Sequence, residues 1–166
     1  NSAEILIVNK DDSLSLADIY INKSRIYGII KESNKAVEYL EQGVKIYLSI
    51  KKSDQSMLFR LSTAYLNLGL TYFEKKDYNN ALLYLEKSLN LKKKNRLSEV
   101  GLPYLNIAKT YVKINDKEKA QKYFLESIAN FKKEFGDEYY KLADAYFDYG
   151  LFLRSIGKNR EAFEIH

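Results

Sequence analysis

The feature that most constrains this chain is a segment that recurs along it in the same residue order. Residues 65–72 (YLNLGLTY) align with residues 104–111 (YLNIAKTY), which lie 39 residues further on. In both segments an alanine follows nine residues after the second tyrosine, at Ala81 and Ala120. A fixed period of this length indicates a repeat protein, in which each repeat buries its apolar face against its neighbours.

The same frame recurs 45 residues before the first of these segments and 42 residues after the second. The matching residues are Tyr20, Asn22, Tyr27, Ala36 and Leu40 upstream, and Tyr146, Gly150, Leu153 and Ala162 downstream. We therefore predict an N-terminal extension over residues 1–12 and a solenoid over residues 13–166. Its repeats are placed at residues 13–56, 57–96, 97–136 and 137–166, and the last repeat is expected to be truncated.

Each copy is predicted to form two helices joined by a short turn. In the second copy the apolar residues recur at spacings of three and four, as on one face of a helix: Leu61, Ala64, Tyr65, Leu68 and Tyr72, then Leu82, Leu85 and Leu89. Asp77 and Asp116 are expected to cap the second helices of their copies. Gly69 is expected to face Ala81, so that the two helices approach closely. The predicted fold is all-α, an α-solenoid of stacked antiparallel helix pairs.

Composition agrees with this fold and narrows the function. Seven glycines and one proline in 166 residues are few for the turns of a many-stranded sheet. The net charge is +5, with lysines interleaved among acidic residues, whereas a nucleic-acid-binding domain usually gathers its basic residues on one face. The apolar run Ile5-Leu6-Ile7-Val8 is too short to span a membrane. We expect a cytoplasmic protein that uses neither nucleic acid nor membrane as its partner.

Catalytic motifs are missing from the sequence. There is no cysteine, and the one histidine is His166, so a histidine-based triad or zinc site would have no partners. No glycine-rich phosphate-binding loop follows a strand pattern. The sequence predicts a protein that is not an enzyme, with no cofactor, no metal and no small-molecule substrate.

The pattern resembles the tetratricopeptide repeat family. The residues that carry this resemblance are Tyr65, Leu68-Gly69, Tyr72, Ala81, Leu85 and Ser88 in the second copy, and Tyr104, Ile107-Ala108, Tyr111, Ala120, Phe124 and Ser127 in the third. The first copy departs from it, with Lys23-Ser24 in place of Leu-Gly. The resemblance implies a right-handed superhelix whose first helices line the concave face.

The period exceeds the ~34 residues of an ordinary tetratricopeptide repeat. The chain therefore resembles the long-period subclass typified by kinesin light chain, and segment 134–138 (EFGDE) with Leu142-Ala143 resembles the linker of that subclass. We expect longer helices and longer loops between repeats, as in Lys92–Ser98 and Lys132–Asp137. The run Lys92-Lys93-Lys94 is interpreted as part of a solvated loop.

The resemblance points to the residue before the Leu-Gly pair as a binding position. Asn22, Asn67, Asn106 and Asp148 occupy it and would form a row along the groove. An asparagine amide both donates and accepts hydrogen bonds, which suits the main chain of an extended peptide. The alternative is that asparagine is simply frequent in this chain, or that each amide braces a neighbouring helix.

Further residues of the first helices complete the predicted groove. Apolar surface comes from Leu66 and Leu70, and positive charge from Arg25, Lys109, Lys113 and Arg154. This combination favours a ligand with acidic side chains or a free carboxylate beside apolar anchors. The alternative is that the cations are solvated or pair with Asp144 and Asp148. The many tyrosines at helical spacing are interpreted as packing residues.

The predicted function is a protein–protein interaction scaffold that binds an extended peptide or partner segment. The alternative is a regulatory or structural arm of a larger protein, beside a caspase-like peptidase, a kinase or a transcription regulator, that acts intramolecularly or by self-association. Self-association would use the truncated C-terminal end, where an apolar face is expected to be uncovered.

Overall fold

The computed structural model describes residues 10–51 and 53–164, and every regular element in these residues is a helix. The eight helices are α1 (Lys10–Ile29), α2 (Ser33–Ser49), α3 (Gln55–Glu74), α4 (Tyr78–Lys94), α5 (Gly101–Lys113), α6 (Lys117–Phe135), α7 (Tyr140–Ser155) and α8 (Asn159–Glu164). Helix α1 begins inside the segment 1–12 that the sequence assigned to an extension. Residues 1–9 of that segment lie outside the described residues.

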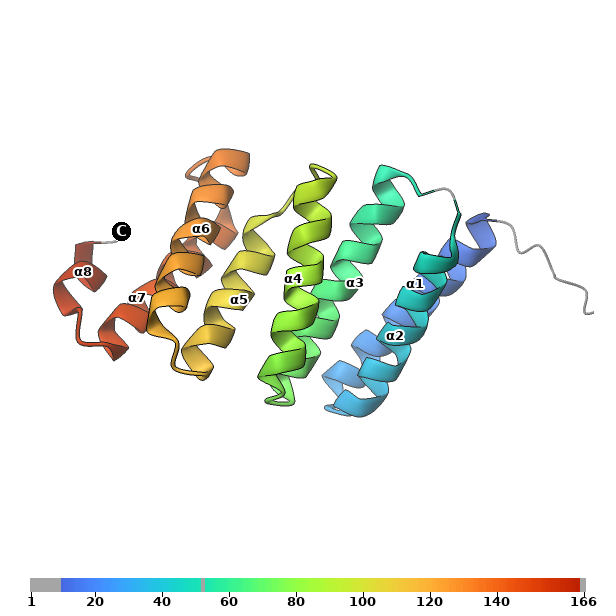
Figure 1. Ribbon diagram of the computed structural model, residues 1–166, viewed down its shortest axis with the longest axis horizontal. Helices are drawn as coiled ribbons and strands as arrows, with labels where there is room; N and C mark the ends of the chain where they lie inside the picture. Colours follow the sequence, from blue (N-terminus) through green and yellow to red (C-terminus); the bar gives the residue numbers. More distant parts are fainter. Residues whose placement is uncertain (1–9, 52, 165–166) are drawn as a thin grey trace, which may run out of the picture.

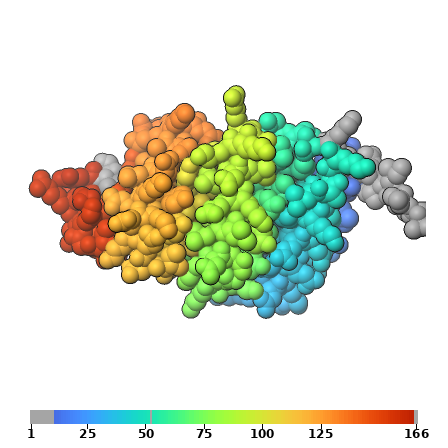
Figure 2. All heavy atoms as spheres, viewed as in Figure 1, coloured from blue at the N-terminus to red at the C-terminus, as the bar shows by residue number. Residues whose placement is uncertain are grey.

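Successive helices lie antiparallel in pairs, α1 with α2, α3 with α4, α5 with α6 and α7 with α8 (Figure 1). The first helices of the pairs form one layer, and α2, α4 and α6 form the layer nearer the viewer. Each of these second helices also packs on the first helix of the next pair. In the space-filling view the pairs therefore follow one another as contiguous bands (Figure 2). The predicted α-solenoid of stacked antiparallel helix pairs is confirmed.

The turn inside each pair has the same backbone geometry in all four copies. One residue of each turn has a positive φ: Lys31 (60°), Lys76 (62°), Asn115 (62°) and Gly157 (83°). In the second copy the Lys76 amide donates to the Phe73 carbonyl and the Asp77 amide to the Tyr72 carbonyl, both at 2.9 Å. These two bonds form a Schellman motif, which satisfies the last carbonyls of the first helix as the chain reverses.

Two sequence predictions about this turn region are confirmed. A carboxylate oxygen of Asp77 accepts from the amide of Asn80, and Asp116 accepts from the amide of Lys119 in the same way. Each cap satisfies one of the free amides at the start of a second helix.

The close approach of Gly69 to the second helix of its pair is also confirmed. A Cβ atom built at Gly69 would lie 2.6 Å from Cγ of Leu85 and 3.2 Å from the carbonyl oxygen of Ala81. A larger residue at this position would therefore push α3 and α4 apart.

The core lies where helices of neighbouring pairs meet. On α3, Leu61, Ala64 and Leu68 are buried in a cluster with residues of α2. On α7, the ring of Tyr149 lies 5.5 Å from the ring of Phe124 on α6, measured between centroids. The same face of each first helix thus packs on the preceding second helix, which is why no pair can bury its apolar surface alone.

A buried hydrogen bond recurs inside two of the pairs. The hydroxyl of Ser88 on α4 donates to the carbonyl of Ser62 on α3 at 2.7 Å. One repeat later, the hydroxyl of Ser127 on α6 donates to the carbonyl of Gly101 on α5 at 2.8 Å. Each bond satisfies a hydroxyl that would otherwise be buried without a partner, so these serines can occupy the core.

The loops between repeats are shorter than the sequence predicted. Helix α4 continues to Lys94 and α6 to Phe135, so the expected loops Lys92–Ser98 and Lys132–Asp137 both begin with helical residues. The extra length of this repeat lies mainly in helices of 16 to 20 residues, with the 13-residue α5 and the six-residue α8 as exceptions.

The interpretation of Lys92-Lys93-Lys94 as a solvated loop is wrong. All three residues belong to α4, and Lys92 is only 1% exposed. The Lys92 ammonium donates to the carbonyl of Ser98 at 2.8 Å and lies 4.4 Å from the ring centroid of Phe59. These contacts hold the Lys92 ammonium between the ring of Phe59 on α3 and the chain that leads into α5.

Candidate functional site

All residues of the predicted binding site lie on the first helices of the pairs. Asn22 and Arg25 belong to α1; Leu66, Asn67 and Leu70 to α3; Asn106, Lys109 and Lys113 to α5; Asp148 and Arg154 to α7. These helices form the layer behind α2, α4 and α6 in Figure 1. We call the outer surface of this layer the first-helix face.

The predicted row of amides occupies equivalent positions, but its members differ in exposure. Asn22 is exposed, whereas Asn67, Asn106 and Asp148 are half-buried. The side-chain amide of Asn106 donates to the carbonyl of Leu102 in its own helix at 2.9 Å. This bond uses one of the two amide hydrogens and fixes the side chain, so the amide keeps a defined orientation.

Two of the predicted charges are joined to each other. The ammonium of Lys109 lies 2.9 Å from a carboxylate oxygen of Asp148, which links α5 to α7 across the first-helix face. The sequence left open whether the cations are solvated or paired with acidic residues. For Lys109 the structure shows pairing.

The other three predicted cations are exposed. Among residues 10–51 and 53–164, the ion pairs do not include Arg25, Lys113 or Arg154. Arg154 also lines a pocket between α7 and α8, beside Phe147 and Leu151. The cations that remain available are thus spread from α1 to α7.

Leu66 needs a correction. It is 8% exposed and packs in the core with Leu85 and Leu105, so its side chain is not offered to a ligand. Leu66 faces the following pair because it lies one residue before the amide position, and that turns it toward α5. Leu70 is half-buried against the same cluster and keeps part of its surface.

The tyrosines form three stacks, one in each of the first three pairs. In each stack a tyrosine of the second helix contacts two tyrosines of the first: Tyr39 with Tyr20 and Tyr27, Tyr84 with Tyr65 and Tyr72, and Tyr123 with Tyr104 and Tyr111, at centroid distances of 5.1 to 6.2 Å. Their interpretation as packing residues is confirmed. Tyr39 was not among the tyrosines expected from the repeat pattern, although it precedes Tyr84 by the same 45 residues that separate the first two copies.

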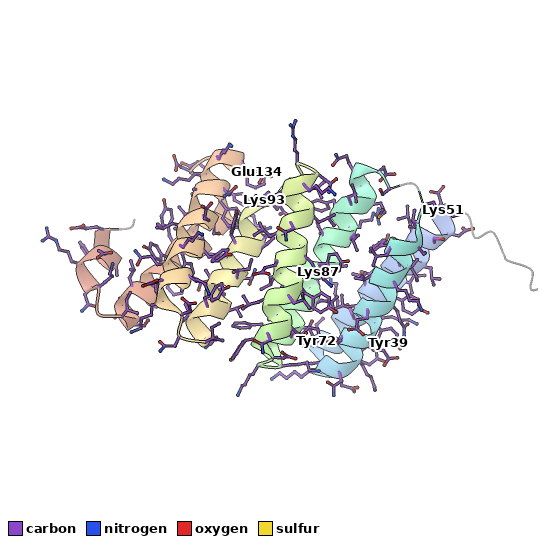
Figure 3. The ribbon with its side chains drawn as sticks, viewed as in Figure 1. Tyr39, Lys51, Tyr72, Lys87, Lys93 and Glu134 are labelled. Atoms are coloured by element: carbon purple, nitrogen blue, oxygen red, sulfur yellow. The ribbon has the colours of Figure 1, made fainter. Side chains whose placement is uncertain are left out.

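Lysines cover the outer faces of these stacks. Lys87 lies 4.9 Å from the ring centroid of Tyr84, and Lys75 lies 5.7 Å from that of Tyr72. Figure 3 labels Lys87 and Tyr72 together with Tyr39, from the successive helices α4, α3 and α2. Burial, with the nearby charge of Glu41, raises the pKa of Tyr72 to about 12.

A second charged cluster links the first two pairs. Asp18 on α1 forms an ion pair with Arg60 on α3 and accepts a hydrogen bond of 2.5 Å from the hydroxyl of Tyr47 on α2. Burial, followed by this bond to Asp18, raises the pKa of Tyr47. The cluster joins α1, α2 and α3 and so holds the first two pairs together.

The described residues contain no group of three or more His, Cys, Asp and Glu side chains placed to hold a metal ion. None of their helices combines the length and the apolar character that crossing a membrane requires.

The family comparison agrees with this geometry. The tetratricopeptide repeat family model matches residues 17–56, 62–95 and 103–130 of this chain. These three matches lie within the first three helix pairs. No curated protein matches the sequence.

Solved structures share the fold at low sequence identity. Aspartyl phosphate phosphatase F from Bacillus subtilis superposes with a TM-score of 0.83 at 22% identity, over 93% of this chain and 39% of that chain. BtubC (BKLC) from P. vanneervenii gives 0.80 at 17%, over 95% and 63%. Kinesin-light-chain-type TPR-like repeats from Podosopora anserina give 0.75 at 18%, over 92% and 72%. The predicted resemblance to long-period repeats is confirmed at the level of the fold.

Proposed function

This chain belongs to the tetratricopeptide repeat family, and from that premise we propose that it is a protein-interaction scaffold whose first-helix face binds an extended segment of a partner protein. The chain spans 39% of the length of the phosphatase and 63% of the length of BtubC. The activity of any longer protein that contains it is therefore part of the proposal.

The observation that carries the proposal is the row formed by Asn67, Asn106 and Asp148. These residues lie at equivalent positions on α3, α5 and α7, and two of them are amides with donors and acceptors. An extended peptide presents main-chain donors and acceptors at regular spacing. A row of side chains that recurs once per repeat can bind it largely independently of its sequence.

Charge supports a preference among such segments. Arg25, Lys113 and Arg154 are exposed cations on α1, α5 and α7, whereas Asp148 is already paired with Lys109. A partner segment with acidic side chains near its ends would gain charge-assisted hydrogen bonds from these cations. The partner that we propose is therefore an acidic peptide segment.

The scaffold is proposed to be non-catalytic and cytoplasmic. The chain has no cysteine and so forms no disulfide, which is compatible with a reducing compartment. The second candidate is a regulatory arm whose first-helix face holds a segment of its own polypeptide. A segment that is covalently linked binds at a high effective concentration, so a low intrinsic affinity would suffice.

The test uses peptides selected on the wild-type chain from a random display library. Their affinity is then measured by fluorescence anisotropy for wild type and for the double variant Asn67→Ala/Asn106→Ala. The proposal expects a loss of about tenfold or more, because two bonds to the peptide main chain are removed. Unchanged circular dichroism of the variant shows that the fold is retained.

The matched control is Asn79→Ala/Asn90→Ala, which removes two exposed amides from α4 on the opposite layer. This control should bind as wild type does. Equal affinities for all three proteins would place binding elsewhere and contradict the proposal.

A further inference from the structure

A pocket of about 140 Å³ lies between the third and fourth helix pairs, at the edge of the solenoid where the turns within the pairs lie (Figure 1). One wall comes from the end of α5 and the start of α6, and the other from the end of α7. The residues that line it are Val112, Asn115, Lys117, Phe152, Ser155 and Ile156.

The α7 wall belongs to the side of that helix that faces the third pair. Phe152 is 4% exposed, and its ring lies 5.6 Å from the ring of Phe124 on α6, measured between centroids. A helix pair that followed α8 would pack on the other side of the fourth pair, as each second helix packs on the next first helix. The pocket is therefore a feature of the junction between two described pairs.

The repeat register explains why this junction stays open. Val112 and Lys117 follow Phe73 and Tyr78 of the second copy by 39 residues. The rings of Phe73 and Tyr78 are half-buried and pack edge to face, with their centroids 5.7 Å apart. In the third pair a valine and an unbranched lysine chain take the place of these two rings, and the space that the rings would occupy remains.

The first junction is bridged in another way. The ammonium of Lys75, directly after α3, donates to the side-chain oxygen of Asn34 in the first pair at 2.5 Å. Ile156 has the position of Lys75 in the fourth copy, and its side chain carries no polar group for such a bond. Neither a pair of rings nor a lysine bridge therefore closes the junction between the third and fourth pairs.

The size of the pocket selects its occupant. An apolar cavity of about 150 Å³ holds one benzene molecule. A volume of about 140 Å³ therefore suits the ring of one phenylalanine or tyrosine side chain. Val112, Phe152 and Ile156 supply apolar contacts for such a ring. Aromatic rings are also what the second pair places at the corresponding positions.

The polar part of the lining adds a charge preference. Lys117 is exposed, and in the part of the chain that the structure describes it forms no ion pair. Asn115 is exposed beside it, whereas the hydroxyl of Ser155 already donates to the carbonyl of Phe152 at 2.6 Å. The donors that remain are the ammonium of Lys117 and the amide of Asn115, and both favour a carboxylate next to the ring.

We propose that this pocket binds an aromatic side chain with a carboxylate next to it, and that Lys117 pairs with the carboxylate. Val112 follows Lys109 by three residues and Phe152 follows Asp148 by four, so the pocket lies one helical turn beyond the Lys109–Asp148 pair. Its use as the anchor site of the partner segment rests on the proposed function, whereas the binding of the ring itself does not.

The test uses N-acetylphenylalanine as the probe, with its amide and N-acetylalanine as comparisons. Binding is measured from the methyl NMR shifts of Val112 and Ile156, with the exposed methyls of Leu83 on α4 as the internal reference. The free acid should bind in the millimolar range, as a fragment of this size does, and about threefold or more tighter than the amide. N-acetylalanine should leave these methyl shifts unchanged, because it has no ring.

Two variants separate the ring from the charge. Val112→Phe/Lys117→Tyr places the rings of the second pair in the pocket and should weaken the binding of both phenyl probes by about tenfold or more. Lys117→Met keeps the space and should reduce the affinity for the free acid to that for the amide. The matched control is Lys133→Met, which removes an exposed charge near the other end of α6 and should bind as wild type does.

Three outcomes would overturn the proposal. They are an absence of shifts with the phenyl probes, Ile156 shifts that are equal in wild type and in Val112→Phe/Lys117→Tyr, and an acid that binds no better than its amide. Asn67→Ala/Asn106→Ala should bind the probe as wild type does, because the amide row does not line the pocket. A failure of the proposed peptide binding is therefore distinguishable from a failure of the pocket.

Discussion

Lys109 on α5 and Asp148 on α7 form a 2.9 Å ion pair that joins two consecutive repeats across the first-helix face. Both side chains are partly exposed, at 40% and 23%. The ion pair itself therefore contributes at most ~1 kcal/mol to the free energy of unfolding. Its larger consequence concerns binding, since Asp148 competes with any acidic ligand for the ammonium of Lys109. One of the four predicted cations, Lys109, is therefore already paired within the protein.

Replacing Asp148 by Asn should therefore increase the affinity for acidic peptides. The change frees Lys109 and removes a repelling carboxylate, and we expect a gain of about tenfold that decreases with added salt. Fluorescence anisotropy at two salt concentrations measures it. The control is Asp137→Asn, which makes the same charge change at an exposed pair with Lys132. Equal gains for both variants would attribute the effect to net charge alone.

Gly69 should tolerate no side chain. Alanine at this position places its Cβ 2.6 Å from Cγ of Leu85, and the carbonyl of Ala81 leaves little room for adjustment. We expect Gly69→Ala to lower the free energy of unfolding by ~1–3 kcal/mol, measured by urea denaturation.

Gly150 provides the comparison, because it has the equivalent position in the last pair and a Cβ there would meet only the Ala162 carbonyl, at 3.9 Å. Gly150→Ala should be neutral or stabilising by up to ~1 kcal/mol through helix propensity. Equal stabilities of the two variants would show that the α3–α4 contact is looser than described.

Replacing Lys76 by glycine should stabilise the folded protein. It has a φ of 62° in the turn between α3 and α4, a conformation that is unfavourable for a residue with a Cβ atom. Gly157 already occupies the equivalent position in the last pair. We expect Lys76→Gly to raise the free energy of unfolding by ~0.5–1 kcal/mol.

The control for this change is Lys94→Gly, at the exposed last residue of α4, where φ is negative. There glycine should be destabilising by ~0.5–1 kcal/mol. Urea denaturation of both variants measures the difference, and a loss of stability in Lys76→Gly would contradict the prediction.

The burial of Lys92 should appear as a pH dependence of stability. Desolvation lowers the pKa of Lys92 below its ordinary value of 10.5, so in the folded state the ammonium holds its proton less tightly than when unfolded. Between the folded and the unfolded pKa the unfolded chain binds more protons. Stability contributed by this group therefore rises with pH in that window.

Lys92→Met removes the titration while keeping an unbranched side chain. The unfolding free energy of Lys92→Met minus that of wild type should be largest at neutral pH. This difference should decrease as the pH approaches 10.5. The measurement is the difference in unfolding free energy between the two proteins from pH 7 to pH 10, in which other titrating groups cancel. A constant difference would show that Lys92 has the same pKa in both states.

Much of the fold could be read from the sequence because its determinants are local or repeat with the chain. The recurrence of Tyr65, Tyr72 and Ala81 one period later predicted the helix pairs. Asp77 and Asp116 predicted where the second helices begin. Such signals depend on the spacing of residues within one pair. The sequence displays that spacing directly.

Only part of the candidate binding site could be predicted from the sequence. The amide row could be listed from the register, since equivalent positions on successive first helices must share a face. The burial of Leu66 and the pairing of Lys109 with Asp148 could not, because each depends on how the next pair lies against the one before it.

The sequence alone thus determined the helix pairs, their caps and the order of stacking, because these follow from the spacing of side chains along the chain. Only the tertiary structure decided that Lys92 is buried, that Asp148 pairs with Lys109, and that Leu66 packs in the core. These outcomes depend on contacts between pairs. The identity of a lysine or a leucine in the sequence does not show which neighbouring helix, if any, packs over its side chain.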